Sequence, residues 1–226
     1  MAGGRAKVPV LAEISGPAPS EARVFSLRRA DVEALAPPLE RLTERRVVMV
    51  SGEGALAGVL AVALAGAAAA AGRRTVLLEC ELARPQLAGE LGLAEQPGLH
   101  EYLRWEATAP EILQPLVLGG SAARRADAPL VCVAGGRPAS DQATLLGLAS
   151  FRHAVKKLRS AYEFVVLSGP ALGAERAALD SAAAQAEAVL LGVSAGQTSG
   201  RAGRALRAAA GRLPLPPLGA VVVGEG

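Results

Sequence analysis

The sequence predicts an α/β fold, with a mostly parallel sheet flanked by helices on both faces. Two observations support this prediction. Short apolar runs rich in Val and Leu alternate along most of the chain with stretches that favour helix, an order typical of parallel sheets buried on both faces. Hydrophobic residues make up 51% of the chain and aromatic residues only 3%, so Ala, Leu and Val must build the core. A chain of 226 residues is long enough for one sizeable domain of this kind.

The apolar runs and the stretches between them predict the order of the elements. Strands are expected at residues 47–50, 75–79, 130–134, 164–168, 188–194 and 218–224. Helices are expected between them at residues 55–72, 86–91, 98–105, 140–161, 174–187 and 200–212. The polar stretch 119–128 is expected to form a loop.

The chain divides into three zones. Residues 1–20 contain Pro and Gly and are expected to form an irregular or extended linker. Residues 21–45 have apolar side chains near helical spacing, but Pro37-Pro38 should break or kink this helix. The alternating strands and helices of the main domain occupy residues 46–226.

Composition excludes several classes of function. The formal charge is only +3, from 24 basic and 21 acidic residues that are dispersed along the chain, so no nucleic-acid partner is expected. The two cysteines, Cys80 and Cys132, lie in apolar strand-like runs without a metal-binding motif and are expected to be buried thiols of a cytoplasmic protein. The uncharged stretch 55–72 is mostly Ala and Gly, which favours a buried helix over a membrane span.

A glycine-containing loop follows the first strand of the main domain. The stretch "SGEG" occupies residues 51–54, with a further glycine at Gly58. Glycine lets a backbone approach a phosphate closely, and the following helix offers free N–H groups. A complete phosphate-binding loop also needs a lysine and a Ser/Thr hydroxyl for Mg²⁺. Because the residues after Gly54 are Ala55 and Leu56, the glycines are expected to serve chiefly the tight strand-to-helix turn.

A resemblance to a known family rests on residues 73–103, "RRTVLLECELARPQLAGELGLAEQPGLHEYL". The strand ending in Glu79-Cys80-Glu81 and the following Arg84-Pro85 resemble the matching stretch of bacterial tyrosine kinases of capsule and exopolysaccharide synthesis. That family belongs to the MinD/ParA-type P-loop ATPases, so the resemblance implies a P-loop NTPase-like fold. Residues 131–147, 158–171 and the last two expected strands resemble the family in order and spacing.

The resemblance also implies partners and a location. Residues 8–16, "VPVLAEISG", resemble the segment that joins the membrane-anchored chain-length regulator of this family to its kinase domain. It implies membrane association through a partner or through an N-terminal anchor outside this chain. The implied partners are a membrane polysaccharide co-polymerase or an active kinase homologue. The family's oligomerisation helix corresponds loosely to the region of Glu21, Leu27 and Arg28, which implies homo-oligomers.

The departures from the family pattern bear directly on catalysis. The loop can be aligned with the family in two ways. Aligned with the kinase motif, Ala55 and Leu56 occupy the positions of the lysine and the serine. Aligned with the MinD-type motif, Gly58 and Val59 occupy the positions of the lysine and the threonine, and Glu53 replaces a second lysine. Ser168 corresponds to the strand-end aspartate that supports Mg²⁺. No positive group is therefore expected at the loop to neutralise a triphosphate, and no catalytic or metal-binding residue is assigned.

These departures predict a catalytically degenerate domain with a regulatory or scaffolding role in exopolysaccharide assembly or export. No cofactor is expected. If nucleotide or anion binding is retained, with ATP and Mg²⁺ as the implied ligands, the contacting residues would be Gly52, Gly54, Gly58, Glu79, Glu81 and Arg84. Otherwise Glu79 and Glu81 are expected to form a solvated strand end or to pair with Arg84.

Two alternative functions remain open. One is an active tyrosine autokinase or MinD/ParA-type ATPase with an unusual loop, and the other is a binding domain that uses Arg84 for a small anion. Away from the loop, His100 and His153 are expected at the surface or at an edge, and Trp105 is expected to pack against the end of a short helix.

Overall fold

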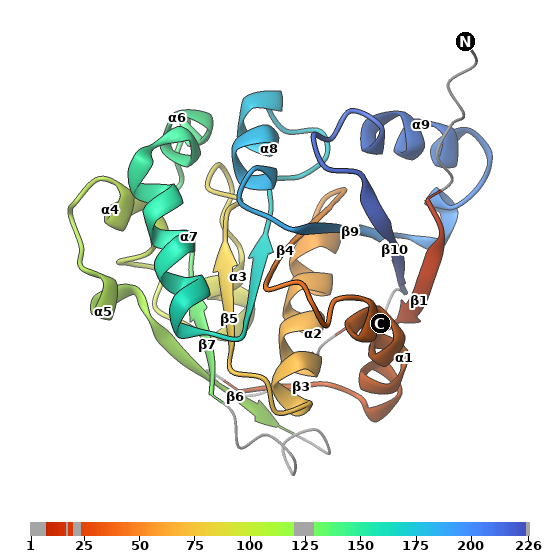
Figure 1. Cartoon of the computed structure of the whole chain (residues 1–226), viewed down its shortest axis with the longest axis horizontal. Helices are drawn as coiled ribbons and strands as arrows, with labels where there is room; N and C mark the ends of the chain where they lie inside the picture. The colour runs from red at the N-terminus through yellow and green to blue at the C-terminus, as the bar shows by residue number, and fades with distance from the viewer. Residues whose placement is uncertain (1–7, 17, 20–23, 120–128, 225–226) are drawn as a thin grey trace.

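The computed structural model of the chain describes residues 8–16, 18–19, 24–119 and 129–224 (Figure 1). The strands are β1 (Val10–Ile14), β2 (Ala18–Pro19), β3 (Val24–Ser26), β4 (Val47–Gly52), β5 (Thr75–Glu79), β6 (Gln114–Gly119), β7 (Leu130–Val133), β8 (Phe164–Ser168), β9 (Ala188–Val193) and β10 (Pro217–Val223). The helices are α1 (Arg29–Arg41), α2 (Leu56–Ala70), α3 (Leu87–Leu91), α4 (Leu99–Leu103), α5 (Ala109–Ile112), α6 (Gln142–Gly147), α7 (Ala149–Ala161), α8 (Arg176–Ala183) and α9 (Gly200–Ala210), with the 3-10 turn η2 (Ala195–Gln197) before α9.

The strands pair in the order β1-β10-β9-β4-β8-β5-β7-β6-β3-β2. Strands β2 and β3 pair antiparallel, as do β6 and β7, and the other pairs are parallel. The carboxyl ends of the central parallel strands therefore lie at one edge of the sheet, where ligands bind in folds of this kind. The predicted fold class is confirmed, and all six predicted strands are present.

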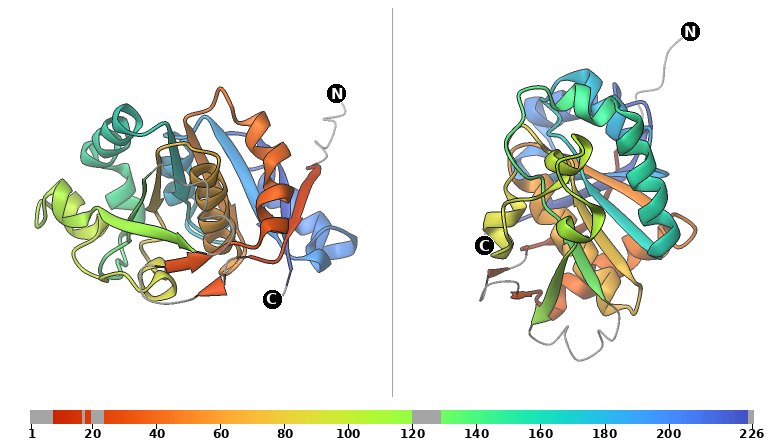
Figure 2. Two further views of the ribbon diagram at one scale, coloured as in Figure 1. Left: turned by 90° about the horizontal axis from the view of Figure 1, so that it is seen from below. Right: turned by 90° about the vertical axis from the view of Figure 1, so that its left-hand side faces the viewer.

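The two faces of the sheet pack against different helices, and both layers can be followed in Figure 2. Because successive side chains of a strand point to opposite faces, Val48 and Val50 pack with α1, α2 and α3. Their neighbours Val47 and Met49 pack with the helices from α4 to α9. The central strands are thus covered on both sides, which explains their continuous apolar sequence.

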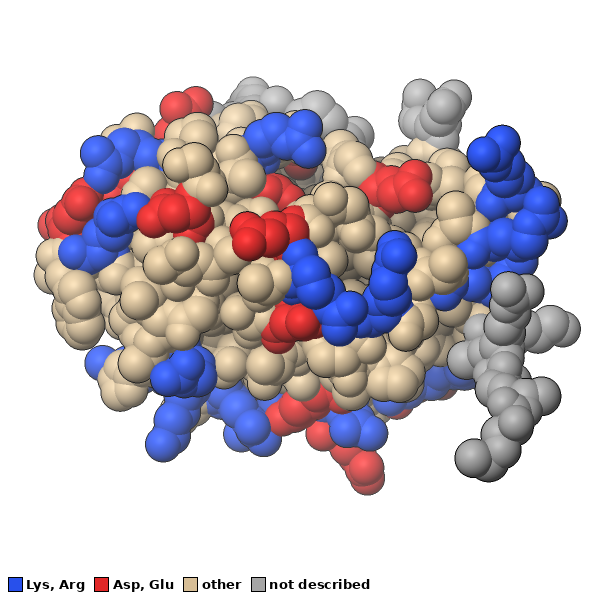
Figure 3. All heavy atoms as spheres, turned by 90° about the horizontal axis from the view of Figure 1, so that it is seen from above, with Lys and Arg blue, Asp and Glu red and all other residues tan. Residues whose placement is uncertain are grey.

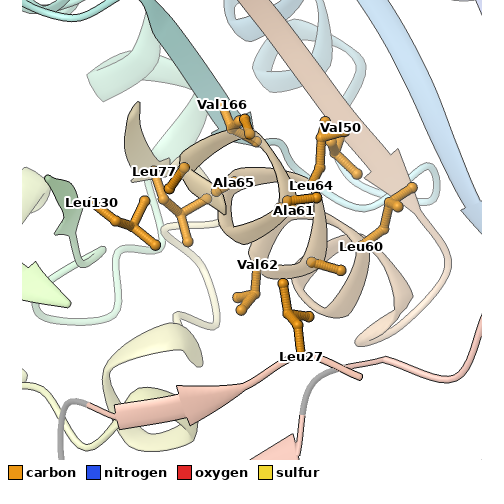
Figure 4. Close-up of a cluster of buried hydrophobic side chains, with 14 of the residues drawn as sticks. Leu27, Val50, Leu60, Ala61, Val62, Leu64, Ala65, Leu77, Leu130 and Val166 are labelled. Atoms are coloured by element: carbon orange, nitrogen blue, oxygen red, sulfur yellow. The ribbon is translucent and has the colours of Figure 1, made fainter. Parts of the chain in front are cut away.

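Figure 4 shows the side chains of α2 between strand residues such as Leu77 and Val166 on one side and Leu27 on the other. The residues of α2 from Leu60 to Ala70 are buried between the sheet and the β3 region. A Cβ atom on Gly66 would lie 2.5 Å from Leu27 Cδ1, so this glycine lets Leu27 pack directly on the helix. Within the described residues, no helix is long and apolar enough to cross a membrane. The expectation of a buried helix at residues 55–72 is confirmed.

The first 45 residues differ most from the expectation. Residues 10–14 are extended, which is one of the two expected forms, but they form strand β1 and pair with β10, so they belong to the sheet of the domain. The single helix expected at 21–45 is shorter, because residues 24–26 form β3 and only Arg29–Arg41 is helical. Pro37 and Pro38 lie inside α1 instead of ending it. Burial of Leu35 and Pro38 against the rest of the domain outweighs the unfavourable helix propensity of proline.

Other differences concern strand β6 and the regions around it. Strand β6 was not predicted, because its side chains alternate between buried and exposed and it contains Pro115. The helix expected at 140–161 is divided at Leu148 into α6 and α7. Of the predicted loop 119–128, Gly119 belongs to β6, and residues 120–128 lie outside the described part of the chain.

Candidate functional site

The connection from β4 to α2 spans only residues 53–55. Gly54 has a φ of +56°, a conformation that glycine adopts without strain. Gly52 has a different role, because a Cβ atom there would lie 2.5 Å from the carbonyl oxygen of Gly192 in β9. At Gly58 a Cβ would make only ordinary contacts, the nearest at 3.5 Å from Leu87 Cδ2. Gly54 is therefore required by the turn, and Gly52 by the close approach of the β9 backbone.

Glu79, at the end of β5, is 2% exposed and accepts three backbone hydrogen bonds. Its Oε1 atom accepts from the N–H groups of Gln86 (2.6 Å) and Leu87 (2.9 Å), and its Oε2 atom accepts from the N–H group of Gly135 (2.8 Å). Burial raises the pKa of this carboxyl, the three hydrogen bonds oppose the shift, and repulsion from Glu81 adds to it. Both oxygens of Glu79 are thus used to join β5, α3 and the end of β7.

The loop after β8 is fixed to the neighbouring strand ends. Glu81 accepts a hydrogen bond from the N–H group of Ala171 at 3.0 Å. Ser51 donates its hydroxyl to the carbonyl oxygen of Pro170 at 2.7 Å, and Leu172 N–H donates to the carbonyl oxygen of Gly52 at 2.9 Å. This loop therefore forms one wall of the site.

Two adjoining cavities lie at this edge of the sheet. The inner one, of about 30 Å³, is lined by Gly54, Gly58, Glu79, Glu81, Ser168 and Arg84, whereas Gly52 lines neither cavity. The outer one, of about 500 Å³, is lined by three carboxylates, Glu53, Glu81 and Glu175, and by one basic side chain, Arg84. The inner cavity has room for one or two water molecules, since a water occupies roughly 30 Å³ in the liquid. The charged groups of the outer cavity leave it net negative.

Arg84 departs from the expectation in two ways. It lines both cavities, so a positive group does reach the loop, contrary to the expectation that none would. Its guanidinium makes no ion pair with any acidic residue that the structure describes, so the predicted pairing with Glu79 and Glu81 is wrong. Glu79 uses both oxygens on backbone N–H groups, which removes one of the two expected partners.

Three residues of the site were missed by sequence reasoning. Gln142 Oε1 accepts hydrogen bonds from the N–H groups of Leu82 (3.0 Å) and Ala83 (3.1 Å), and so holds the segment that carries Arg84. Gln197, in η2, donates its side-chain amide to Glu53. Glu175 lines the outer cavity from the start of α8. Because these residues are distant in sequence and form no motif, only the folded chain reveals them.

A second polar cluster lies beside α4, away from the loop. His100 is buried and not at the surface, because its Nδ1 atom contacts the carbonyl oxygen of Arg137 at 2.6 Å and its Nε2 atom accepts from Arg104 at 2.8 Å. Trp105 is 82% exposed and does not pack the helix end as expected, whereas His153 is exposed as predicted. Cys80 and Cys132 are buried free thiols, as expected. Among the described side chains, no group of three or more His, Cys, Asp or Glu could hold a metal ion.

Comparison with known proteins identifies solved structures with a similar fold. No family model matches the sequence, and no curated protein matches it. The kinase domain of Escherichia coli tyrosine kinase ETK is similar with a TM-score of 0.75 and 16% identity, over 96% of this chain and 90% of that chain. The VpsO kinase domain has a TM-score of 0.70 and 20% identity, over 87% and 94%. The septum site-determining protein MinD of Pyrococcus horikoshii, complexed with Mg-ADP, has a TM-score of 0.50 and 18% identity, over 80% and 82%.

The structural neighbours thus include bacterial tyrosine kinase domains and a MinD protein, which confirms the predicted P-loop NTPase-like fold. At these identities the likeness establishes the fold. The activity has to be argued from the site of this chain.

Proposed function

We propose that this chain is a catalytically degenerate relative of the P-loop tyrosine kinases, with a regulatory or scaffolding role in the assembly or export of a bacterial polysaccharide. The observation that carries the proposal is the charge at the loop. The outer cavity is lined by Glu53, Glu81 and Glu175 against the single basic residue Arg84. Ala55 and Leu56, at the start of α2, offer neither an ammonium group nor a hydroxyl.

The energetic cost of this arrangement is large. Each lost charged hydrogen bond is worth about 1.5–3 kcal/mol. Losing the lysine and the metal-binding hydroxyl therefore removes about 3–6 kcal/mol, which weakens a micromolar nucleotide to about the millimolar range or beyond. Phosphoryl transfer suffers further, because it depends on electrostatic stabilisation of the transferred group.

The residues present do not fit Mg-ATP. The inner cavity of about 30 Å³ is too small for a phosphate chain, so the chain would have to lie in the outer cavity, which three carboxylates and one arginine line. Glu79 already accepts three backbone hydrogen bonds, two at Oε1 and one at Oε2, so only part of its acceptor capacity is left for a bound ion. At the end of β8, Ser168 replaces the carboxylate that the resemblance implies, and it is only 3% exposed.

A scaffolding role would act through surfaces outside the loop. The resemblance implies docking on a membrane polysaccharide co-polymerase or on an active kinase homologue, and self-association through the region of α1. Strand β1 contains most of the segment that resembles the family's link to its membrane-anchored regulator, and it lies at the edge of the sheet beside β10. A partner linked through this segment would therefore meet the domain at that edge.

Calorimetry with Mg-ATP tests the proposal. The wild-type chain is expected to show no binding at physiological nucleotide concentration. A double variant, Ala55→Lys with Leu56→Ser, restores the missing cation and hydroxyl and is expected to gain affinity, and Arg84→Gln is the control for the cation that is already present. Micromolar affinity in the wild type, abolished in Arg84→Gln, would overturn the proposal.

Arg84 supports a second candidate, a site for a small anion or a nucleotide, because it lines both cavities and makes no ion pair with any described acidic residue. A thermal-shift screen with nucleotides and sugar phosphates would detect such a site. A ligand that stabilises the wild type but not Arg84→Gln would favour it over the scaffolding role. Phosphate release from ATP in the same preparation would favour an active ATPase.

A further inference from the structure

Helix α9 presents a face of arginines to the solvent. Arg201, Arg204 and Arg212, which follows the C-cap at Gly211, are exposed together with Ala205 and Ala208. The spacing of Arg201, Arg204, Ala205 and Ala208 puts them on one side of α9, and Arg212 lies in the turn directly after the helix. The opposite side of α9, with Gly203, Leu206 and Ala210, is buried.

The charge of this face is not compensated locally. Residues 188–224 contain no Asp or Glu, and no described acidic residue forms an ion pair with Arg201, Arg204 or Arg212. In Figure 3, Lys and Arg gather over α9 at the right-hand end of the face shown, with no Asp or Glu among them. Elsewhere the described arginines often pair, as Arg104 does with Asp141 at 2.7 Å and Arg159 does with Glu187 at 2.7 Å. The α9 face is therefore a separate basic surface.

We propose that the α9 face binds an anionic lipid surface directly. Clustered Lys and Arg are attracted to anionic leaflets without a shaped pocket, and a helix with one basic face is typical of membrane-surface contacts. The hot spots of protein interfaces combine Arg with Trp and Tyr anchors that sit in well-packed pockets. Between the arginines this face offers only small alanines. Since the apolar side of α9 is buried in the domain's own core, the helix would lie flat on the head groups without inserting.

The attraction is moderate and additive. One arginine near an anionic surface contributes about a fivefold increase in partitioning. The three arginines of the α9 face together give roughly a hundredfold increase. This contribution is screened by salt within a Debye length of about 8 Å at physiological ionic strength, so it would assist rather than replace attachment through a membrane partner.

Vesicle co-sedimentation of the full chain tests the proposal, with vesicles of phosphatidylcholine alone and vesicles that also contain phosphatidylglycerol. The wild type is expected to bind only the anionic vesicles and to be released by high salt. The variant Arg201→Gln/Arg204→Gln/Arg212→Gln is expected to lose about a hundredfold in partitioning. The matched control, Arg152→Gln/Lys156→Gln/Lys157→Gln, removes the same charge from the exposed side of α7 and should retain binding.

Replacing the three α9 arginines with lysine separates lipid from protein recognition. Lysine keeps the charge and should keep vesicle binding, whereas a site that needs bidentate guanidinium geometry would lose affinity. Equal binding to neutral vesicles, or an equal loss in the α7 control, would overturn the proposal. Retention on immobilised polyglutamate without any binding to anionic vesicles would overturn it in favour of an acidic protein partner. Urea unfolding midpoints of all variants confirm that each one is folded.

Discussion

Replacing Glu79 with alanine removes the acceptor that joins three segments of the domain. The carboxylate is 2% exposed and accepts the N–H groups of Gln86, Leu87 and Gly135 at 2.6–2.9 Å. In Glu79→Ala these three donors remain in a region largely closed to water. Removal of the carboxylate also leaves an unfilled space between β5 and α3.

The expected loss of stability follows from these contacts. A buried donor without a partner costs about 1–3 kcal/mol. Part of this is offset, because the raised pKa of Glu79 shows that burial of its charge is unfavourable. We therefore expect Glu79→Ala to lower the free energy of unfolding by about 3 kcal/mol. With a urea m-value of about 2–3 kcal/mol/M for a chain of this size, the midpoint should fall by about 1 M or more.

Urea unfolding followed by circular dichroism measures this loss, with Glu81→Ala as the matched control. Glu81 accepts only one backbone hydrogen bond, from Ala171, and is partly exposed, so its removal should cost about 1 kcal/mol. If the two variants have the same urea midpoint, the conclusion that Glu79 stabilises the domain by joining β5, α3 and the end of β7 is wrong. In that case its carboxylate would be free for another role.

Three further outcomes are expected. Because the pKa of Glu79 is raised in the folded state, folding favours its protonated form. The stabilisation from this carboxyl should be complete below the ordinary pKa of 4.5 and should decline as the pH rises through the raised folded value. The difference in free energy of unfolding between the wild type and Glu79→Gln, measured against pH, should show this decline. A Cβ at Gly192 would lie 2.6 Å from the carbonyl oxygen of Leu56, so Gly192→Ala should destabilise by about 1–3 kcal/mol, whereas Gly89→Ala, with open space around it, should be neutral or slightly stabilising in thermal melts. Arg73 lies 4.1 Å from the centre of the Phe164 ring, and Arg73→Gln should cost about 0.5–1 kcal/mol in the same melts, an expectation that an unchanged midpoint would refute.

The sequence predicted the central sheet because its strands are buried on both faces. A run such as Val47–Val50 is apolar at every position, and that pattern does not depend on which elements cover it. Strand β6 could not be recognised in this way, because only alternate residues are buried and Pro115 interrupts the run. Strand β1 is short, and its pairing with β10, some 200 residues later, is a tertiary contact without a local signal.

The neighbourhood of the glycine loop and the strand-end acids could be predicted from the sequence, but their contacts could not, and binding of a ligand there stays a prediction. The glycine loop and the acids of the following strand lie together at the carboxyl edge, as the strand order requires. The expected pairing of Arg84 failed because backbone N–H groups compete for the Glu79 carboxylate, and their positions depend on α3 and the end of β7. Gln142, which holds the segment carrying Arg84, has no sequence signal at all.

The glycines of the loop have a sufficient explanation without a nucleotide. Gly52 and Gly192 are paired across β4 and β9, and each would bring a Cβ within 2.6 Å of a backbone oxygen. Glycine at both positions lets the start of α2 approach the sheet. Gly54 supplies the left-handed backbone conformation in the turn between β4 and α2. These requirements remain even when the lysine, the hydroxyl and the strand-end carboxylate are absent. A glycine-rich loop in this fold is therefore evidence for the packing of α2 on the sheet, and evidence for phosphate binding only when a cation and a metal ligand accompany it.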